Sequence, residues 1–307
     1  MGTAEIVERF RVTDGDGFRL KHFDPADTCG LDIDKDSAKQ LLQGGVQRLR
    51  ELQERLYAGK RWSLLILLQA MDTAGKDSTI EHVMSGINPQ GCRVVSFKAP
   101  SQLELSHNFL WRATCALPGR GEIGIFNRSY YEEVLVVRVH PELLRKQGLA
   151  PQLMGKDIWQ ERFTSIRAFE RHLIGNGSII LKFFLNLSKA EQRRRLLERI
   201  DRPEKNWKFD AADLAERRHW DAYQASYQDA IAHTASEAAP WHVVPADNKW
   251  FSRLFVAAAI VDCLEKRNLE FPEVDEEARE AMARARDELM AEGDDGESRL
   301  TKGRDDG

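Results

Sequence analysis

Apolar positions along the chain follow two repeats, one typical of amphipathic helices and one typical of buried strands. From Ser37 to Tyr57 they recur every three or four residues, which predicts a helix with one buried face. The next run, SLLILLQA, is apolar at nearly every position, as a parallel strand covered on both faces requires. Helical spacing returns at once in TAGKDSTIEHVM. These stretches predict a helix followed by a strand, a loop and a second helix.

The alternation of strands and helices continues as far as Lys266. Further strands are predicted at Arg93 to Phe97, at Glu122 to Phe126, and in SIILKFFLNLS and WHVVP. Further helices are predicted at Ser101 to about Ala116, from near Ser129, at Ile158 to Ile174, after Ser188 with Glu191 completing a capping box, and at Lys249 to Lys266. Strands separated by helices imply an α/β fold with a mostly parallel sheet and right-handed crossovers. Ligands of such sheets bind beyond the carboxyl ends of the strands.

Composition and charge narrow the classes of partner. The 45 Lys and Arg residues nearly balance the 49 Asp and Glu residues, and the net charge of −4 argues against a dedicated nucleic-acid binder. The four cysteines lie far apart without a CxxC pair, which indicates neither a zinc cluster nor a disulfide framework. The sequence has no apolar signal core and no apolar run long enough to span a bilayer. We therefore expect a cytoplasmic protein with no nucleic-acid or membrane partner.

The turn after the first apolar strand carries the main candidate chemistry. Its window AMDTAGKD is similar to the phosphate-binding loop GxxxxGK[ST], the Walker A motif, in which amides and a lysine hold phosphate oxygens at a helix N-terminus. Ala70 replaces the first glycine and Asp77 replaces the hydroxyl residue, whereas Gly75 and Lys76 fit the pattern. The alternative is a turn glycine followed by a solvated lysine. We predict phosphate binding here and, with it, phosphoryl transfer.

Asp72 lies inside this loop, where a carboxylate would repel a bound phosphate unless a cation lies between them. Mg²⁺ supplies such a cation, because it binds one or two carboxylates together with substrate phosphate oxygens. Asp72 is therefore a candidate metal ligand, or a residue that orients the attacking phosphate.

The strand ending at Phe126 contributes a second candidate group. Asn127 and Arg128 follow it directly, and neighbouring parallel strands place their carboxyl ends at one edge of the sheet. An arginine in that position can hold a moving phosphoryl group with two hydrogen bonds. The alternative is a surface ion pair between Arg128 and Glu132, four residues further on.

A basic stretch, EQRRRLLERIDRPEKNWKF, follows the cap at Ser188. Its cations are Arg193, Arg194, Arg195, Arg199, Arg202, Lys205 and Lys208. We expect the helix arginines to be mostly solvated, and the loop from Arg202 to Lys208 to form a cationic lid over bound phosphates. Trp207, flanked by lid cations, is either a packing residue or a contact for a nucleotide base.

Six blocks of the sequence together resemble the type-two polyphosphate kinases. They are LLILLQAMDTAGKDSTIEHVMSGINPQG, FKAPS, ELSHNFLWR, GEIGIFNRSYYEEVLVVRVHPE, FFLNLSKAEQRRRLLERIDRPEKNWKF and APWHVVPADNKWF, in the family's order, within roughly Asp16 to Asn268. The resemblance implies a three-layer P-loop kinase fold, thymidylate-kinase-like, with a helical lid. It also implies reversible transfer of the terminal phosphoryl group of inorganic polyphosphate to nucleoside mono- or diphosphates, including ATP synthesis. FNRSYY looks most like the subgroup acting on both acceptors.

The resemblance also implies Mg²⁺, or Mn²⁺ in its place, a homo-oligomer, and a set of site residues. Catalytic roles fall on Asp72, Lys76, Asn127 and Arg128, with Asp72 also the metal ligand. Phosphate or nucleotide binding falls on Thr73, Ala74, Gly75, Asp77, Ser78, Lys98, Arg112, Arg202, Lys205 and Lys208. The chain departs from the family where Ala70 replaces a frequent glycine and Asn127 a frequent aspartate. Because an amide neither acts as a base nor brings charge to a metal, Asp72 would have to serve as the base if the reaction needs one.

Three parts of the chain are expected: an N-terminal helical extension at 1–60, a P-loop core at 61–268 with a lid around 195–212, and a tail at 269–307. In the tail, Glu273 to Glu292 can form a charged helix, whereas GDDGESRLTKGRDDG is predicted to be disordered. Two rival functions stay open. An ATP-dependent nucleoside monophosphate kinase would fit the same fold. A nucleotide-switched binding protein is disfavoured, because Asp77 stands where switch proteins use a Ser or Thr.

Overall fold

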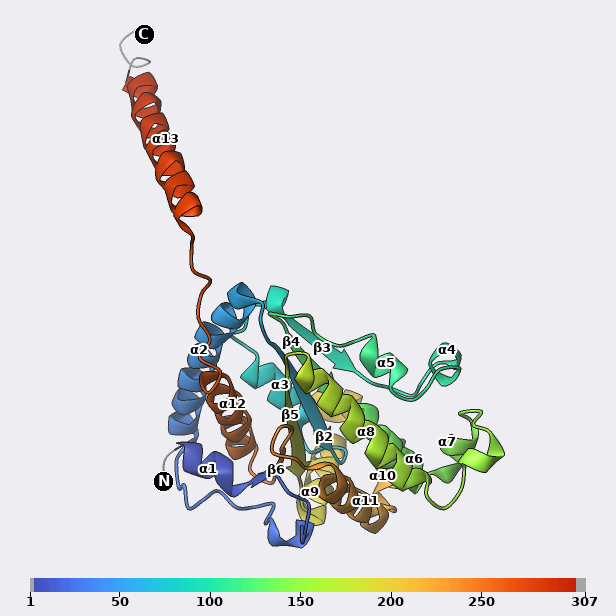
Figure 1. Cartoon of the computed structure of the whole chain (residues 1–307). Helices are drawn as coiled ribbons and strands as arrows, with labels where there is room; N and C mark the ends of the chain where they lie inside the picture. The colour runs from blue at the N-terminus through green and yellow to red at the C-terminus, as the bar shows by residue number, and fades with distance from the viewer. Residues whose placement is uncertain (1–2, 302–307) are drawn as a thin grey trace. The chain divides into compact units, whose positions relative to one another are not determined.

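The computed structural model describes residues 3–301 and is organised around one six-stranded sheet (Figure 1). The strands are β1 (Arg11–Val12), β2 (Ser63–Ala70), β3 (Cys92–Ser96), β4 (Ile123–Asn127), β5 (Ser178–Asn186) and β6 (Trp241–Pro245). Their order across the sheet is β1-β6-β5-β2-β4-β3, and every neighbouring pair is parallel except β1 with β6. The mostly parallel sheet expected from the sequence is confirmed. The two-residue β1 was not predicted, because it is too short to show a repeat.

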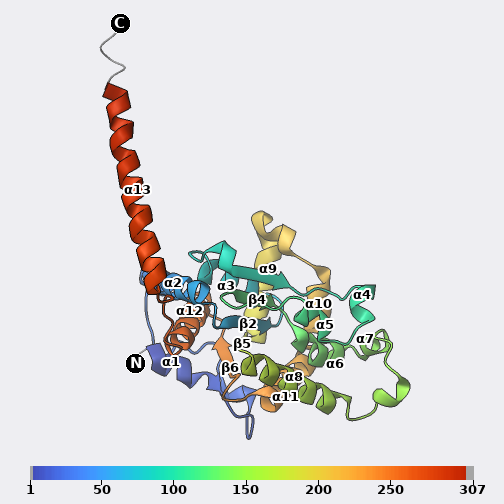
Figure 2. The same cartoon turned by 45° about the horizontal axis from the view of Figure 1, so that its top comes forward.

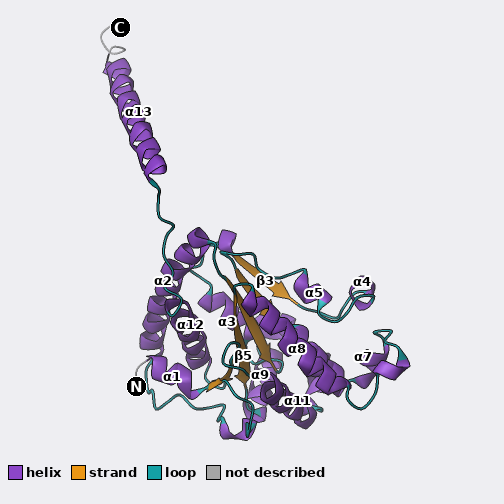
Figure 3. Ribbon diagram, viewed as in Figure 1, coloured by secondary structure: helices purple, strands orange, loops and turns teal. Residues whose placement is uncertain are grey.

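Helices make up most of the remaining chain (Figure 3). They are α1 (Thr3–Arg9), α2 (Lys35–Gly59), α3 (Lys76–Val83), α4 (Gln102–Leu105), α5 (Trp111–Thr114), α6 (Val136–Val139), α7 (Pro141–Arg145), α8 (Ile158–Gly175), α9 (Lys189–Asp201), α10 (Ala211–Arg217), α11 (Trp220–Thr234), α12 (Lys249–Glu265) and α13 (Glu276–Thr301). Short 3₁₀ turns are η1 (Leu20–His22), η2 (Pro89–Gly91), η3 (Tyr130–Val134), η4 (Pro151–Leu153) and η5 (Pro203–Lys208).

The helices cover both faces of the sheet and give a three-layer arrangement (Figure 1, Figure 2). On one face, α1, α2, α3 and α12 pack against alternate residues of β2 such as Leu64 and Ile66. On the other face, α8, α11 and η3 pack against Leu65 and Leu67. Successive strand residues point to opposite faces, so a strand covered twice must be apolar throughout. This packing explains the unbroken apolar run of β2.

Two predicted helices are shorter than expected. The segment from Ser101 to Ala116 forms α4 and α5 with a break between them, where the Asn108 side chain accepts a hydrogen bond from the Leu110 amide. Such side-chain bonds to nearby backbone compete with helix formation. After Ser129, the chain forms η3, α6 and α7 in place of one helix. The prediction of continuous helices was wrong in both places.

The cap of α9 also differs from the prediction. Ser188 accepts a hydrogen bond from the Glu191 amide at 3.0 Å, as an N-cap does. The Glu191 carboxylate instead accepts from Arg194 and Arg195, while the Ser188 amide donates to Asp247. The predicted capping box is therefore only half formed.

The chain divides into two compact units after Glu270. The second unit contains α13, which runs past Glu292 into the segment for which we expected disorder. Residues 302–307, the end of that segment, lie outside the described residues. Among the α13 side chains that the structure describes, Met282, Leu289 and Met290 are large, apolar and exposed. Within residues 3–301, no helix combines the length and the apolar character that crossing a membrane would require.

One buried ion pair links β5 to the helices behind it. The Lys182 side chain is 0% exposed, and its ammonium donates to Glu170 at 2.7 Å, to the Thr234 carbonyl at 2.8 Å and to the Tyr131 hydroxyl at 3.2 Å. Glu170 also accepts from the hydroxyls of Tyr130 and Tyr131. Burial lowers the pKa of Lys182, and the Glu170 charge opposes that change. Three donors thus meet three acceptors, which compensates for taking both charges out of water.

His242 of β6 is a second ionisable group in the core. It is 2% exposed and lies beside the rings of Phe183 and Phe255. Burial lowers its pKa to about 3, because a charged imidazole would lose its hydration there. The core therefore holds this side chain in its neutral form.

Candidate active site

The loop between β2 and α3 is held in an unusual backbone conformation. Thr73 and Gly75 have φ angles of 67° and 103°, in the left-handed region. Glycine adopts this region freely, whereas a β-branched residue such as threonine does so only when its surroundings hold it there. Gly75 is also the N-cap of α3 and supplies no side-chain cap, so the first amides of the helix are open to a ligand.

Two side chains of α9 hold this loop through its carbonyl groups. Gln192 donates to the Asp72 carbonyl at 3.1 Å. Arg195 donates to the carbonyls of Thr73 and Ala74 at 3.1 and 3.0 Å, and also to the Ala246 carbonyl at 2.6 Å. Three consecutive loop carbonyls are therefore directed toward α9.

Arg195 was expected to be one of the solvated helix arginines, and that expectation was wrong. Its side chain is only 3% exposed, because the face of α9 that carries Gln192, Arg195 and Leu196 packs inward. Backbone carbonyls and Glu191 satisfy its guanidinium in place of water. The exposed Arg193 and Arg194 do match the expectation.

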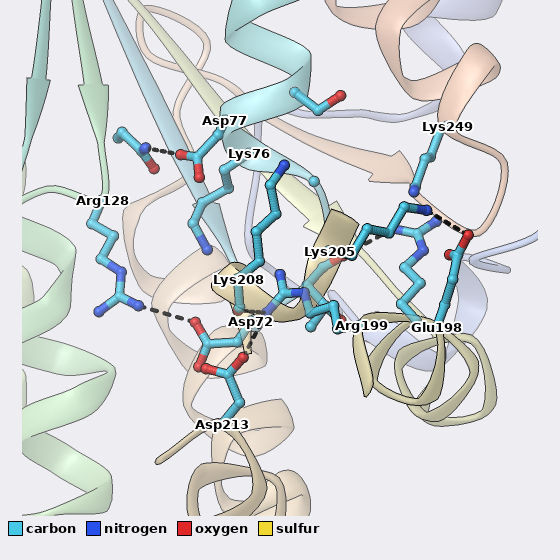
Figure 4. Close-up of a pocket in the computed structure, with 15 residues that line it drawn as sticks. Asp72, Lys76, Asp77, Arg128, Glu198, Arg199, Lys205, Lys208, Asp213 and Lys249 are labelled. Carbon is cyan, nitrogen blue, oxygen red and sulfur yellow. Dashed lines mark hydrogen bonds and ion pairs between the residues drawn. The ribbon is translucent and has the colours of Figure 1, made fainter. Parts of the chain in front are cut away.

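Lys76 and Arg128 enter the site from two neighbouring elements. The Lys76 ammonium donates to the Ala70 carbonyl at 3.0 Å; burial lowers its pKa, and the Asp72 charge opposes this. Arg128, with a φ of 63°, donates to Asp72 at 3.0 Å and lies 3.9 Å from Glu132. The predicted ion pair with Glu132 and the predicted position beside the loop are thus both present. Figure 4 shows Arg128 directed at Asp72.

Asn127 connects β4 to the start of α3. Its amide donates to the Asp77 carboxylate at 2.5 Å. Asp77 occupies the position of the usual hydroxyl residue, and its carboxylate is held by Asn127 across the loop. Asn127 therefore fixes the spacing between the strand end and the helix.

The lid residues face the loop across a cavity of about 290 Å³. Seven cations line the part of this cavity that the structure describes, namely Lys76, Arg128, Arg195, Arg199, Lys205, Lys208 and Lys249. Four carboxylates accompany them, those of Asp72, Asp77, Glu198 and Asp213. All of these residues except Arg195 are labelled in Figure 4, which shows them around one space. Cations outnumber carboxylates in the lining of this cavity, and such an excess of positive charge favours the binding of a polyanion.

Some predicted residues do not reach this cavity. Arg202 instead lies 3.2 Å from Glu198. Arg112 donates to the Lys98 carbonyl at 2.8 Å, and neither side chain is part of the cavity lining. Ala74 is buried, and its carbonyl accepts a hydrogen bond from Arg195. Thr73, Gly75, Ser78, Lys205 and Lys208 do line it.

Sequence reasoning missed Lys249 and Asp213. Lys249 is the first residue of α12, just beyond the carboxyl end of β6; burial and the charge of Arg195 lower its pKa. The strand-end rule applied to β6 could have identified it. Asp213 of α10 pairs with Arg199 at 2.8 Å, and burial together with the Asp72 charge raises its pKa. Only the three-dimensional fold brings Asp213 opposite the loop.

The donor groups suit a metal ion that is shared with a substrate. Thr73 Oγ1 is buried beside Asp72, and no described residue forms a hydrogen bond with it. Among the described residues, no group of three or more His, Cys, Asp or Glu side chains is placed to hold a metal by itself. A divalent ion at Asp72 would therefore need further oxygen ligands from water or phosphate, which is the usual coordination of Mg²⁺.

Comparison with known proteins shows independently which family this chain resembles. A family model described as polyphosphate kinase 2 matches residues 32–272. An ADP-polyphosphate phosphotransferase of Rhodopseudomonas palustris is 49% identical over 285 residues, which cover 92% of this chain and 98% of that protein. An AMP/ADP-polyphosphate phosphotransferase of Meiothermus ruber is 46% identical over 267 residues, covering 87% and 96%.

The solved structures agree with these sequence matches. The crystal structure of polyphosphate kinase 2 from Arthrobacter aurescens TC1 superposes with a TM-score of 0.82 at 40% identity, covering 93% of this chain and 97% of that one. The P-loop kinase fold expected from the sequence is thereby confirmed.

Proposed function

This chain belongs to the polyphosphate kinase 2 family, and we propose from that premise that it transfers the terminal phosphoryl group of inorganic polyphosphate to a nucleoside mono- or diphosphate. The observation that carries the proposal is the cavity between loop and lid, where seven cations face four carboxylates among the residues that the structure describes. That excess suits two polyanions meeting in one site, and it exceeds what a single neutral or weakly charged substrate would need.

The reaction needs placement and charge stabilisation more than proton transfer. The bond between the terminal phosphorus and its bridging oxygen breaks, and that oxygen leaves on the shortened polyphosphate. An anionic phosphate oxygen of the nucleotide forms the new bond, so no proton has to be removed. With ADP as acceptor the product is ATP.

We assign Lys76 and Arg128 to the moving phosphoryl group. Both cations reach the cavity beside Asp72, which holds Arg128 at 3.0 Å. Glu132 supports the same guanidinium from its other side at 3.9 Å. The lid cations Lys205 and Lys208, with Lys249, hold the remaining phosphates.

Members of this family are phosphotransferases that generally need a divalent metal ion. We assign Asp72 as its protein ligand, with Mg²⁺ as the ion and Mn²⁺ as a substitute. When bound, the ion neutralises charge between the phosphates and the carboxylate. Asn127 contributes no charge to it, and its amide instead holds Asp77.

An assay matrix tests the proposal. Purified protein is incubated with Mg²⁺ and polyphosphate plus AMP, ADP, GMP or GDP, and products are separated by chromatography. We expect ATP from ADP, and phosphorylation of both mono- and diphosphates. If ADP and polyphosphate give no ATP while ATP and a monophosphate react readily, the chain is an ATP-dependent monophosphate kinase. Nucleotide-dependent binding of another protein without transfer would indicate a switch protein.

Location and assembly belong to the same proposal. A cytoplasmic enzyme has access to the nucleotides that serve as acceptors, and the family resemblance implies a homo-oligomer. Light scattering coupled to size-exclusion chromatography measures the assembly directly, and fractionation of the source cells measures the location.

A further inference from the structure

The side chain of Gln192 in α9 is held at both ends of its amide. Its nitrogen donates to the Asp72 carbonyl of the phosphate loop at 3.1 Å. Its oxygen accepts a hydrogen bond from Arg217 of α10 at 2.7 Å. The residue is only 1% exposed, so water does not take the place of either partner. The amide therefore bridges the phosphate loop and α10, the helix that follows the lid.

The chemistry of the two partners fixes the direction of this bridge. A guanidinium only donates hydrogen bonds, and a backbone carbonyl only accepts them. The amide oxygen must therefore face Arg217, and the amide nitrogen must face the carbonyl of Asp72. A carboxylate in place of Gln192 could not donate to the loop, and an ammonium there could not accept from Arg217. An amide meets both requirements in a single side chain.

Arg217 is itself held against α9. The nitrogen that donates to Gln192 also donates to the carbonyl of Lys189, the first residue of α9, at 2.8 Å. The guanidinium lies 5.9 Å from the centre of the Trp220 ring. In the part of the chain that the structure describes, Arg217 does not line the phosphate cavity. It reaches the loop through Gln192.

The bond to the Asp72 carbonyl matters because the same residue carries a carboxylate of the site. That carboxylate accepts from Arg128 at 3.0 Å, and the next residue, Thr73, has a left-handed backbone with φ 67°. Such a conformation persists only where the surroundings hold it. Rotation of the peptide between Asp72 and Thr73 would change the direction of the Thr73 amide and the place of the Asp72 carboxylate.

We infer that Arg217 is a positioning residue for the phosphate loop and acts through the Gln192 amide. The inference rests on the proposed function, because it takes a chain of phosphates to be the ligand of this loop. When α10 lies against α9, Arg217 orients the amide, and the amide holds the Asp72 carbonyl. When α10 moves away, the amide loses the partner that fixes its direction. The place of α10 is thereby coupled to the shape of the loop.

The rival role for Arg217 is direct contact with bound phosphate, and a double-mutant cycle separates the two. Calorimetric titration measures tripolyphosphate binding to the full chain in the parent, Arg217→Met, Gln192→Met and the double variant. Network residues that do not touch a ligand change its binding about two- to thirtyfold, and we expect about tenfold for each single variant. The double variant should also lose about tenfold, because the two side chains act as one unit.

Three further variants sharpen the test. Arg217→Lys keeps a donor and should lose less than Arg217→Met. Gln192→Glu still accepts from Arg217 but cannot donate to the loop, so it should lose at least as much as Gln192→Met. Arg218→Met removes the exposed arginine next in the sequence and is the matched control, which should bind within about twofold of the parent. The stoichiometry of each titration reports the folded fraction separately from Kd.

Three outcomes overturn the inference. Losses that multiply to about a hundredfold in the double variant would assign Arg217 a direct contact with phosphate. An unchanged Kd in Arg217→Met, whatever its stoichiometry, would leave the residue a structural role at most. An equal loss in Arg218→Met would trace the effect to overall charge.

None of these readouts depends on turnover. The expected coupling in a protein that fails to use polyphosphate would overturn the proposed function and leave the role of Arg217 intact. An enzyme that uses polyphosphate but whose two losses multiply would do the reverse.

Discussion

The core and the cavity of this protein differ in how their charged side chains are balanced. In the core, one lysine meets one glutamate, and each donor of the Lys182 ammonium has an acceptor. In the cavity, seven cations of the described part of the chain face four carboxylates. A matched buried pair compensates for its own desolvation, whereas unmatched cations repel one another until an anion arrives.

This difference distinguishes structural charges from functional ones. Removing one partner of the core pair should destabilise the fold, because it leaves the other partner buried and alone. Removing one cation from the cavity should relieve repulsion and cost activity instead. The following predictions test that contrast, from the largest expected effect to the smallest.

Lys182→Met should lower the free energy of unfolding by about 3 to 5 kcal/mol, because Glu170 would keep its charge without its partner. Chemical denaturation measures the change. The double variant Lys182→Met with Glu170→Gln is the control, and it should recover part of the loss. A single variant as stable as the parent would contradict the structural role of this pair.

Lys76→Met should lower turnover about a hundredfold or more, since a charge-stabilising contact to the moving phosphoryl group is lost. Its unfolding midpoint should not fall, because burial already disfavours the charged ammonium at this position. Steady-state kinetics and thermal denaturation give the two readouts. Lys266→Met, which removes an exposed cation on α12's C-terminal side, should change neither. A large fall in stability together with activity would mean that Lys76 is structural.

Tripolyphosphate should raise the unfolding midpoint by relieving repulsion in the cavity. At a ligand concentration a hundred times Kd, the stabilisation is about 2.7 kcal/mol. Lys208→Ala should reduce it, and added salt should reduce it further, because screening weakens charge contacts. Differential scanning calorimetry with and without tripolyphosphate measures the shift. Equal shifts in the parent and in Lys208→Ala would remove Lys208 from the binding surface.

His242 should make stability depend on pH in the acid range. Its folded pKa of about 3 is below the usual 6.5, so the unfolded chain takes up the proton first as pH falls. The contribution is complete above pH 6.5 and is lost toward pH 3, at up to about 1.4 kcal/mol per pH unit. His242→Leu should flatten the dependence of unfolding free energy on pH between 6 and 4. The exposed His172→Gln should leave it unchanged, and identical slopes in all three proteins would contradict the prediction.

Much of the fold could be predicted from the sequence because burial on both faces leaves a clear pattern. β2 and β5 are mostly apolar, with long apolar runs on both faces, and the helices beside them show regular apolar spacing. Prediction failed where side chains bond to nearby backbone, as Asn108 does between α4 and α5. Such local bonds leave no period in the sequence.

The site residues also fall into two groups, those that the sequence pattern indicated and those that it did not. Asp72, Lys76 and Arg128 lie at strand ends or in a recognisable loop, so residue type and position together indicated them. The prediction for Arg195 was wrong. A basic run in the sequence does not show that one of its arginines will be buried with backbone carbonyls as hydrogen-bond acceptors. Asp213 reaches the cavity only through the folding of a distant helix, and a sequence pattern does not contain that contact.

The double attachment of α9 limits how this scaffold can be redesigned. Near its start the helix binds the phosphate loop through Gln192 and Arg195, and near its end it carries Arg199, which binds Asp213 of α10 just after the lid. A protein engineer who exchanges the lid to accept another donor therefore cannot treat it as a separate module. The graft must begin after Arg199 and must keep the pitch of α9, or the loop will lose its shape along with the old specificity.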